Sequence, residues 1–374
     1  MHLSIQMKNS FWIAGIMSVL GLPGIASAQD FEGFENLFTP VRTYVTYQCQ
    51  EEISIDGKAT EKSWQKAEWS EYFEDIEGDL KPRPAYETRF KMLWDAQNLY
   101  YYFELQEPHV WAYYDRHDMV VFHENDIELF IDPDRDCYNY FEYELNAQNI
   151  LFDLFLNKPY RNGAKPDIEW NAPGFESAVY VDGTLNNPAD KDRKWCVEVK
   201  IPFASFARDE HFEPAGDGDM WKMNFSRVQW HTEVVDGKYV RVKDKASGRN
   251  LPENNWVWSP QGVINMHFPE RWGLVQFSKE AVGTTKVSFQ MPLDELLARH
   301  LWLVYYKQQQ FRNENQRFAA SLEELQVSKS GMESKVSFEL EMTATADDFK
   351  LKLTAANGCV LMLDNSSLLT KATN

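Results

Sequence analysis

The stretch Trp195-Cys196-Val197-Glu198-Val199-Lys200-Ile201-Pro202 places an apolar residue at every second position. Successive side chains of a β-strand point to opposite faces, so this alternation predicts a strand with one buried face, ended by Pro202. Similar short runs, separated by turn residues, lie at 90–94, 99–105, 126–131, 138–145, 150–156, 179–185, 220–230 and 272–277. Many short alternating strands with regular turns predict an all-β sandwich or barrel.

The pattern changes after Ser278, where the spacing of apolar residues becomes helical. Leu293, Leu297 and Leu301 share one side of a predicted helix over 293–314, and a second short helix is expected at 321–325. Strands are predicted at 336–342, 349–354 and 359–363. We therefore interpret residues 280–374 as a small α+β appendage to a β-region over residues 51–279.

The first residues have the pattern of an export signal. Lys8 precedes an apolar run over 11–22, and the small-residue tripeptide Ala26-Ser27-Ala28 follows. The run is shorter than the roughly 20 residues that span a bilayer, although a membrane anchor is the alternative. We expect a signal peptide at 1–28, an N-terminal extension at 29–50, and a secreted or periplasmic protein with no membrane span after signal removal.

Charge and cysteine spacing exclude several classes of protein. The net charge of -19 disfavours a nucleic-acid partner but tolerates neutral ligands and Ca²⁺. Cys49, Cys137, Cys196 and Cys359 are far apart, which excludes zinc-ribbon and thioredoxin motifs. Export permits disulfides, but the sequence does not choose among the three possible pairings, and Cys196 fits an unpaired buried thiol equally well.

An ordered series of motifs follows the predicted strands. They begin with Ile53-Ser54-Ile55-Asp56-Gly57-Lys58 and include Asn125-Asp126-Ile127-Glu128-Leu129-Phe130-Ile131-Asp132-Pro133. The others lie at 93–100, 140–146, 183–186, 195–203, 223–227, 258–260 and 267–273. Together, over roughly residues 50 to 278, they resemble family 9 carbohydrate-binding modules.

The resemblance implies a fold, a ligand and a partner. The fold would be a DOMON-like antiparallel β-sandwich of jelly-roll type. The ligand would be a polysaccharide or oligosaccharide held between aromatic walls, often beside calcium sites. Such modules usually accompany a xylanase or similar enzyme, whereas no hydrolase domain is recognisable here. We therefore expect non-catalytic carbohydrate binding, with a secreted glycoside hydrolase as a separate partner.

Aromatic candidates for the walls lie in two long predicted loops. A pyranose ring packs its C–H face on an aromatic side chain. Trp111 and Phe122 belong to the loop over 107–125, and Trp258 ends the loop over 236–260. The alternative is that these aromatic residues cover the hydrophobic core of the sandwich. Three other tryptophans, Trp64, Trp94 and Trp195, are expected inside the core.

Polar candidates for the sugar hydroxyls lie on the strands. Glu128 and Glu142 alternate with apolar residues, which predicts that they face away from the core. Asn146 and Asp153 are expected on the same face, and a cleft carboxylate with Arg227 could hold vicinal hydroxyls. A surface or inter-strand ion pair is the alternative.

Asp132, Asp134 and Asp136 follow a predicted strand at a spacing that suits the oxygen ligands of Ca²⁺. The alternative is a solvated acidic turn. No other cofactor is required by the sequence.

Three other functions stay open. A β-sandwich with this composition could be structural or could bind another protein. Paired carboxylates could process glycosides, although no catalytic motif singles out a pair. Haem would need axial ligands, for which His109, His117, His123 and Met119 are candidates.

Overall fold

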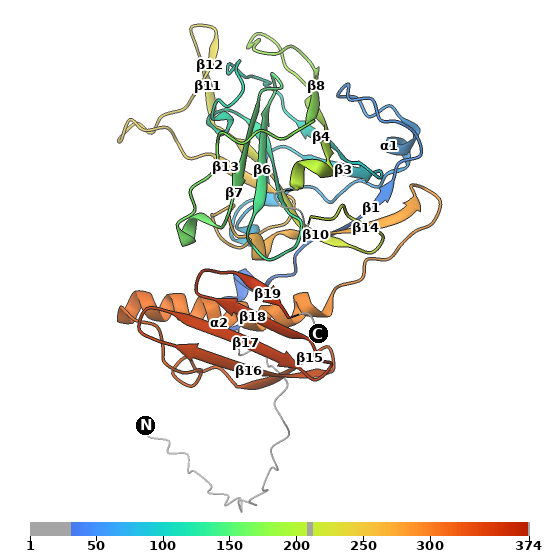
Figure 1. Ribbon diagram of the computed structural model, residues 1–374. Helices are drawn as coiled ribbons and strands as arrows, with labels where there is room; N and C mark the ends of the chain where they lie inside the picture. The colour runs from blue at the N-terminus through green and yellow to red at the C-terminus, as the bar shows by residue number, and fades with distance from the viewer. Residues whose placement is uncertain (1–30, 208–211, 373–374) are drawn as a thin grey trace, which may run out of the picture.

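The computed structural model describes residues 31–207 and 212–372 (Figure 1). The predicted signal peptide at 1–28 lies outside the described residues. Figure 1 shows a larger β-region above a smaller sheet that α2 accompanies. Within the described part of the chain, no helix combines the length and apolar character that crossing a membrane requires.

The larger region is built on one curled sheet of twelve strands. Its path runs β7-β6-β5-β10-β14-β1-β3-β4-β9-β8, with β13 and β2 branching from β10. β1 pairs in parallel with β14 and β3, and the other pairs are antiparallel. The strands are β1 Thr43–Gln48, β2 Glu74–Asp75, β3 Thr88–Trp94, β4 Asn98–Gln106, β5 Asp126–Asp132, β6 Tyr140–Asn146, β7 Leu151–Leu156, β8 Glu176–Asp182, β9 Lys194–Pro202, β10 Met220–Gln229, β13 Asn254–Val257 and β14 Gly273–Ala281. The predicted all-β class is confirmed as a mainly β fold, whereas the parallel pairs of β1 depart from the expected antiparallel sandwich.

The sheet curls until its two halves face each other across an apolar core. The ring of Phe225 on β10 lies 4.5 Å from that of Phe90 on β3, between centroids. The two ends of the path also meet, because Asn149 Nδ2 beside β7 donates to the Ser177 carbonyl oxygen on β8 at 3.0 Å. The expected core residues Trp64, Trp94 and Trp195 are all buried.

Part of the loop predicted over 236–260 is a β-hairpin instead. β11 Thr232–Val235 and β12 Lys238–Arg241 are joined by Asp236 and Gly237, whose φ angles are 50° and 75°. Positive φ at both positions of a two-residue loop is the geometry of a type I′ turn, which Asp-Gly favours. The loop prediction is therefore wrong here, and also at β13.

The smaller sheet follows the order β15-β16-β17-β18-β19, and α2 packs against β17 and β18. The elements are α2 Leu293–Asn315, β15 Ser330–Glu333, β16 Val336–Ala344, β17 Phe349–Ala355, β18 Val360–Asp364 and β19 Leu369–Lys371. Residues 321–325 form turns, so the second predicted helix is wrong. The remaining helices are α1 Lys62–Lys66 and short 3-10 helices, η2 Glu35–Phe38, η3 Gly78–Leu80, η4 Val121–His123, η5 Tyr160–Asn162, η6 Phe203–Phe206 and η7 Pro269–Arg271.

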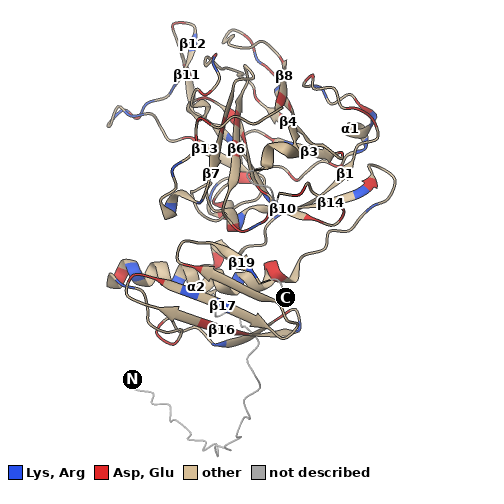
Figure 2. Cartoon of the chain, in the orientation of Figure 1, with Lys and Arg blue, Asp and Glu red and all other residues tan. Residues whose placement is uncertain are grey.

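Paired charges connect the two regions. Lys222 Nζ on β10 lies 2.7 Å from Glu295 Oε1 on α2, and both side chains are largely buried. Arg161 Nη2 lies 2.9 Å from Glu270 Oε2, whose other oxygen accepts a hydrogen bond from the Tyr306 hydroxyl at 2.7 Å. Figure 2 shows acidic and basic residues distributed over both regions. All four cysteines are free, and Cys196 is the buried thiol that its alternation allowed.

Candidate ligand pocket and carboxylate clusters

Two of the three predicted aromatic walls are buried. Trp258 is fully buried, with its ring 5.2 Å from that of Phe90, and it packs so closely on Gly273 that a Cβ there would lie 2.4 Å from the indole. Trp111 is covered by Trp230 and by Tyr239 of β12. The predictions of exposed platforms at Trp258 and Trp111 are therefore wrong, the second because the unforeseen hairpin covers it.

Phe122 is the remaining wall candidate, and its side chain is 37% exposed. It lies in η4, and its backbone N–H donates to Glu144 Oε2 at 3.1 Å. Phe122 is therefore a surface aromatic on the cover of the β5–β6 face, where its role in sugar binding stays a prediction.

Arg227 lies on the core side of β10. Its guanidinium is buried and pairs with Glu107, with Nη2 2.9 Å from Oε2, and it also donates to Thr88 Oγ1 at 3.0 Å and Gln229 Oε1 at 2.9 Å. The prediction that Arg227 binds vicinal hydroxyls is wrong, because its donors serve a buried internal ion pair.

Glu128, Glu142 and Asn146 lie on the face of the sheet opposite the main core, as their alternation predicted. Ile127, Leu129 and Tyr143, between them on the same strands, belong to that core. The opposite face is nevertheless closed, because a second apolar cluster around Trp272 covers it and the three polar residues are buried. The prediction that they line an open cleft is wrong.

Asp153 lies on the other face from Asn146, contrary to the prediction. Phe155, two residues further along β7, contributes to the main core, whereas Phe152 and Leu154 belong to the second cluster. The alternation of β7 therefore directs Asp153 toward the gap between the two ends of the curled sheet.

A cavity of about 500 Å³ occupies this gap between β7 and β8. We call it the edge pocket; it is lined by Ile55, His117, Asn149, Leu151, Asp153, Asn171, Ala172, Phe175, Glu176 and Ser177. Its walls combine carboxylates, amides and an imidazole with apolar side chains. The ring of Phe175 stacks on that of the core residue Tyr143, with centroids 5.4 Å apart and planes at 12°.

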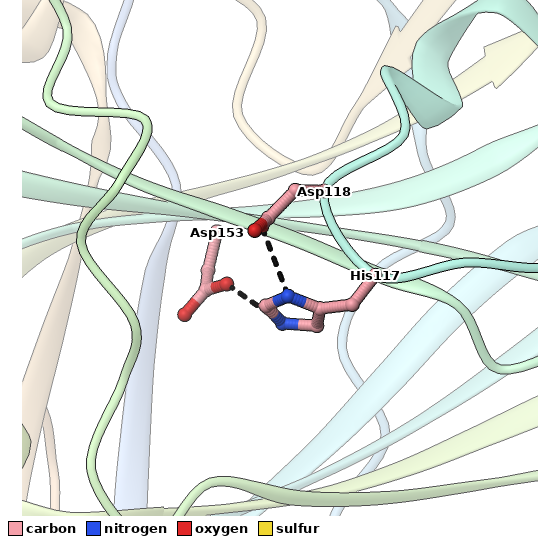
Figure 3. A group of neighbouring side chains, drawn as sticks. All are labelled: His117, Asp118 and Asp153. Atoms are coloured by element: carbon pink, nitrogen blue, oxygen red, sulfur yellow. Dashed lines mark ion pairs between the residues drawn. The ribbon is translucent and has the colours of Figure 1, made fainter.

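His117 is held between two carboxylates at the edge pocket (Figure 3). Its Nδ1 lies 3.0 Å from Asp118 Oδ1, and its Nε2 lies 3.2 Å from Asp153 Oδ1. Asp153 is fully buried, and its Oδ2 accepts the backbone N–H of Ala172 at 2.6 Å. Burial raises the pKa of Asp153, against the opposing effects of the Ala172 N–H and His117.

The pocket also contains buried oxygen atoms whose hydrogen-bonding capacity is unused. Asn149 Oδ1 has no hydrogen-bond partner, and Asp153 Oδ1 makes no well-aligned hydrogen bond despite its proximity to His117. A buried polar atom without a partner costs about 1–3 kcal/mol, so these atoms favour a ligand or water that can donate to them. The sequence analysis missed Asn149, Asn171 and Phe175, which no local motif marks.

The predicted calcium residues lie together at the end of β5. Carboxylate oxygens of Asp132, Asp134 and Asp136 come within 4.8 Å of one another. Asp132 accepts the backbone N–H groups of Arg135 and Cys137, both at 3.0 Å. The donor set and spacing fit Ca²⁺, whose binding here stays a prediction.

The haem candidates have unrelated partners. His109 Nδ1 lies 3.0 Å from the Tyr239 hydroxyl, whereas His117 lies between Asp118 and Asp153. The imidazole rings of His109 and His117 therefore contact different side chains.

Residues 55–216 match a family model described as carbohydrate family 9 binding domain-like. The resemblance to family 9 carbohydrate-binding modules is confirmed. Every residue that lines the edge pocket falls within the matched range. No curated protein matches the chain.

Solved structures with a similar chain include family 9 modules. A module from Caldicellulosiruptor kristjanssonii in complex with cellotriose has 14% identity and a TM-score of 0.38, covering 67% of this chain and 100% of that chain. The same organism's module with glucose has 14% identity and a TM-score of 0.36, covering 65% and 100%. A Bacteroides uniformis protein, proposed to bind carbohydrate, has 17% identity and a TM-score of 0.46, covering 64% and 100%.

Proposed function

We propose that this chain binds carbohydrate non-covalently in the edge pocket and acts as a non-catalytic recognition module. The observation that supports this most is the position of the pocket, whose whole lining falls within the residues that match the family 9 model. The proposal moves the site from the predicted loop tryptophans to the junction of β7 and β8.

The pocket has the size and chemistry that a neutral sugar needs. Its volume of about 500 Å³ lies within the range of about 300–1,000 Å³ typical of small-molecule sites. Asp153 and Asn149 present acceptors for hydroxyl groups, and Phe175 and Leu151 present apolar surface for the C–H face of a ring. Fixed acceptors beside an aromatic ring favour a polyhydroxylated ligand over a purely apolar one.

The proposed context extends beyond the pocket. An export signal at 1–28 would place the protein outside the cytoplasm, where polysaccharides and secreted glycoside hydrolases occur. Residues 51–279 would form the binding β-sandwich, extended at its N-terminus by 29–50, and residues 280–374 its α+β appendage. Asp132, Asp134 and Asp136 would hold a structural Ca²⁺ without taking part in sugar recognition.

Calorimetric titration with soluble polysaccharides and short oligosaccharides tests the proposal, with product release assayed in parallel. We expect binding without products, weakened in Phe175→Ala and in Asn171→Ala, which changes an exposed side chain. Phe122→Ala is the matched control, because it removes an exposed phenyl ring outside the pocket and should leave affinity unchanged.

Each other outcome contradicts a named part of the proposal. Loss of binding in Phe122→Ala alone would return the site to the predicted loop. Product release would make the protein an enzyme. The absence of binding across the panel, in protein with native circular dichroism, would favour a structural or protein-binding role.

A further inference from the structure

A second cavity, of about 250 Å³, lies at the contact between the larger β-region and the appendage. We call it the junction pocket. Its wall combines residues 37–41, which precede β1, with η7 and with the N-terminal half of α2. Most of this wall is apolar, and it includes Met291, Leu296 and Trp302. Every lining residue lies outside the residues 55–216 that match the family model, so the junction pocket is separate from the edge pocket.

The two carboxylates at the junction pocket already have cationic partners. Glu270 Oε2 lies 2.9 Å from Arg161 Nη2. Glu295 lies 2.7 Å from Lys222 Nζ through Oε1 and 3.6 Å from Arg135 Nη1 through Oε2. These pairs neutralise the acidic side chains of the pocket, so neither acid requires a further cation.

The two guanidinium groups at the same pocket have no carboxylate partner. Arg271 is 6% exposed, and it donates to the backbone carbonyl oxygens of Thr39 and Gln261 and to the Thr39 hydroxyl. Arg299 donates to the Phe38 carbonyl oxygen at 2.9 Å. In the part of the chain that the structure describes, neither guanidinium forms an ion pair. Burial lowers the pKa of Arg271 and the charge of Arg299 lowers it further, as expected for two cations that lack a counter-ion.

A neutral donor in the pocket wall is also without an acceptor. Trp302 is 4% exposed, and among the described residues no acceptor bonds to its Nε1–H. A buried N–H group without an acceptor is destabilising, and a buried cation without a counter-ion is more so. The donors of this pocket therefore call for an anionic acceptor. A planar carboxylate group suits guanidinium donors, whereas the apolar wall suits a hydrocarbon body.

We propose that the junction pocket binds a small organic carboxylate with a short apolar body. The carboxylate group would accept hydrogen bonds from Arg271, Arg299 and Trp302, and the hydrocarbon would pack against Met291 and Leu296. The volume of about 250 Å³ is slightly below the range of about 300–1,000 Å³ typical of small-molecule sites, which limits the ligand to a short chain or a single ring. This site does not depend on sugar binding in the edge pocket.

Calorimetric titration of the full chain with sodium butanoate, hexanoate and phenylacetate tests the proposal, with the corresponding primary alcohols as uncharged counterparts. We expect saturable binding at one site, and the alcohol should bind roughly tenfold more weakly because charge-assisted hydrogen bonds are lost. Arg299→Gln should weaken carboxylate binding by a similar factor. Arg312→Gln is the matched control, because Arg312 is exposed on the same helix and does not line the pocket. No saturable binding of any carboxylate, or equal affinity for a carboxylate and its alcohol, would overturn the proposal.

Substitution of an exposed methionine tests the location without removing a charge. Met291 lines the pocket and is 40% exposed, so Met291→Trp should fill the apolar part of the pocket and abolish binding. Met332→Trp is its control, because Met332 is equally exposed but lies on β15. In heteronuclear NMR spectra of protein with isotope-labelled tryptophan, the ligand should shift the indole N–H resonance that Trp302→Phe removes. Unchanged affinity in Met291→Trp, or an unshifted Trp302 resonance, would place the carboxylate elsewhere and overturn the proposal.

Discussion

The edge pocket differs in access from the carboxylate cluster, a group of four buried acidic residues on β5 and β6 that comprises Asp126, Glu128, Glu142 and Glu144. The edge pocket is a cavity of about 500 Å³ between the two ends of the curled sheet. The carboxylate cluster is covered by the apolar residues around Trp272. A cavity beside acceptor atoms can admit a polyhydroxylated molecule, whereas the covered carboxylates are shielded from one.

The buried ion pairs of the protein differ from the carboxylate cluster in their charge balance. Arg227 with Glu107 and Lys222 with Glu295 are buried charges that have basic and acidic partners. Among the described residues, no Lys or Arg forms an ion pair with the carboxylate cluster, and the imidazole His267 Nε2 lies 4.0 Å from Glu142 Oε2. The contrast predicts that removing one member of a buried ion pair destabilises the protein more than removing one of several neighbouring carboxylates.

Removing Arg227 should have the largest effect. Arg227→Met leaves Glu107 buried without its cation, which should lower the free energy of unfolding by about 3–5 kcal/mol. Urea denaturation followed by tryptophan fluorescence measures the change. Adding Glu107→Leu should recover part of the loss, and a loss below about 1 kcal/mol in Arg227→Met would contradict the assigned ion pair.

Cation binding should have the next largest effect. A ligand that binds only the folded state at 100 times its Kd adds about 2.7 kcal/mol to the free energy of unfolding. Ca²⁺ should therefore raise the urea midpoint, and EDTA should reverse the increase. An unchanged midpoint at millimolar Ca²⁺ would contradict the calcium site proposed at Asp132, Asp134 and Asp136.

Truncating the aromatic wall of the edge pocket should weaken sugar binding without a comparable loss elsewhere. Phe175→Ala removes an aromatic contact worth about 0.5–1.5 kcal/mol, or up to roughly tenfold in Kd. Calorimetry with the best ligand of the panel measures it, against Phe122→Ala. Equal affinities in wild type and Phe175→Ala would place the sugar elsewhere.

Replacing His117 should have the smallest effect. Its side chain is 44% exposed, so its contact with Asp153 is screened by solvent and should contribute less than about 1 kcal/mol to stability or binding. His117→Ala should therefore lower sugar affinity only a few-fold, with His123→Ala as a control from the same loop. A loss of 100-fold would make His117 a principal ligand contact.

Local patterns predicted the strands and the long helix because each is determined by a short repeat. The alternation of β9 and the helical spacing of 293–314 both matched the structure. Arg227 could have been placed correctly as well. Met223 and Phe225 precede it at alternate positions of β10, so the same alternation directs Arg227 into the core.

The edge pocket could not be predicted from local patterns. It forms where β7 and β8 meet, and these strands are at opposite ends of the strand order. Only closure of the whole sheet brings Asp153 near Ser177. The burial of Trp111 likewise depends on a hairpin from a distant segment, although Asp236-Gly237 was a local signal for that hairpin.

A crystal structure with the tightest-binding oligosaccharide of the panel tests the central claim most directly. We predict a sugar ring in the edge pocket, packed on Phe175, with a hydroxyl group donating to Asp153 Oδ1. A sugar bound beside Phe122 or elsewhere, with an empty edge pocket at saturating ligand, would contradict the account.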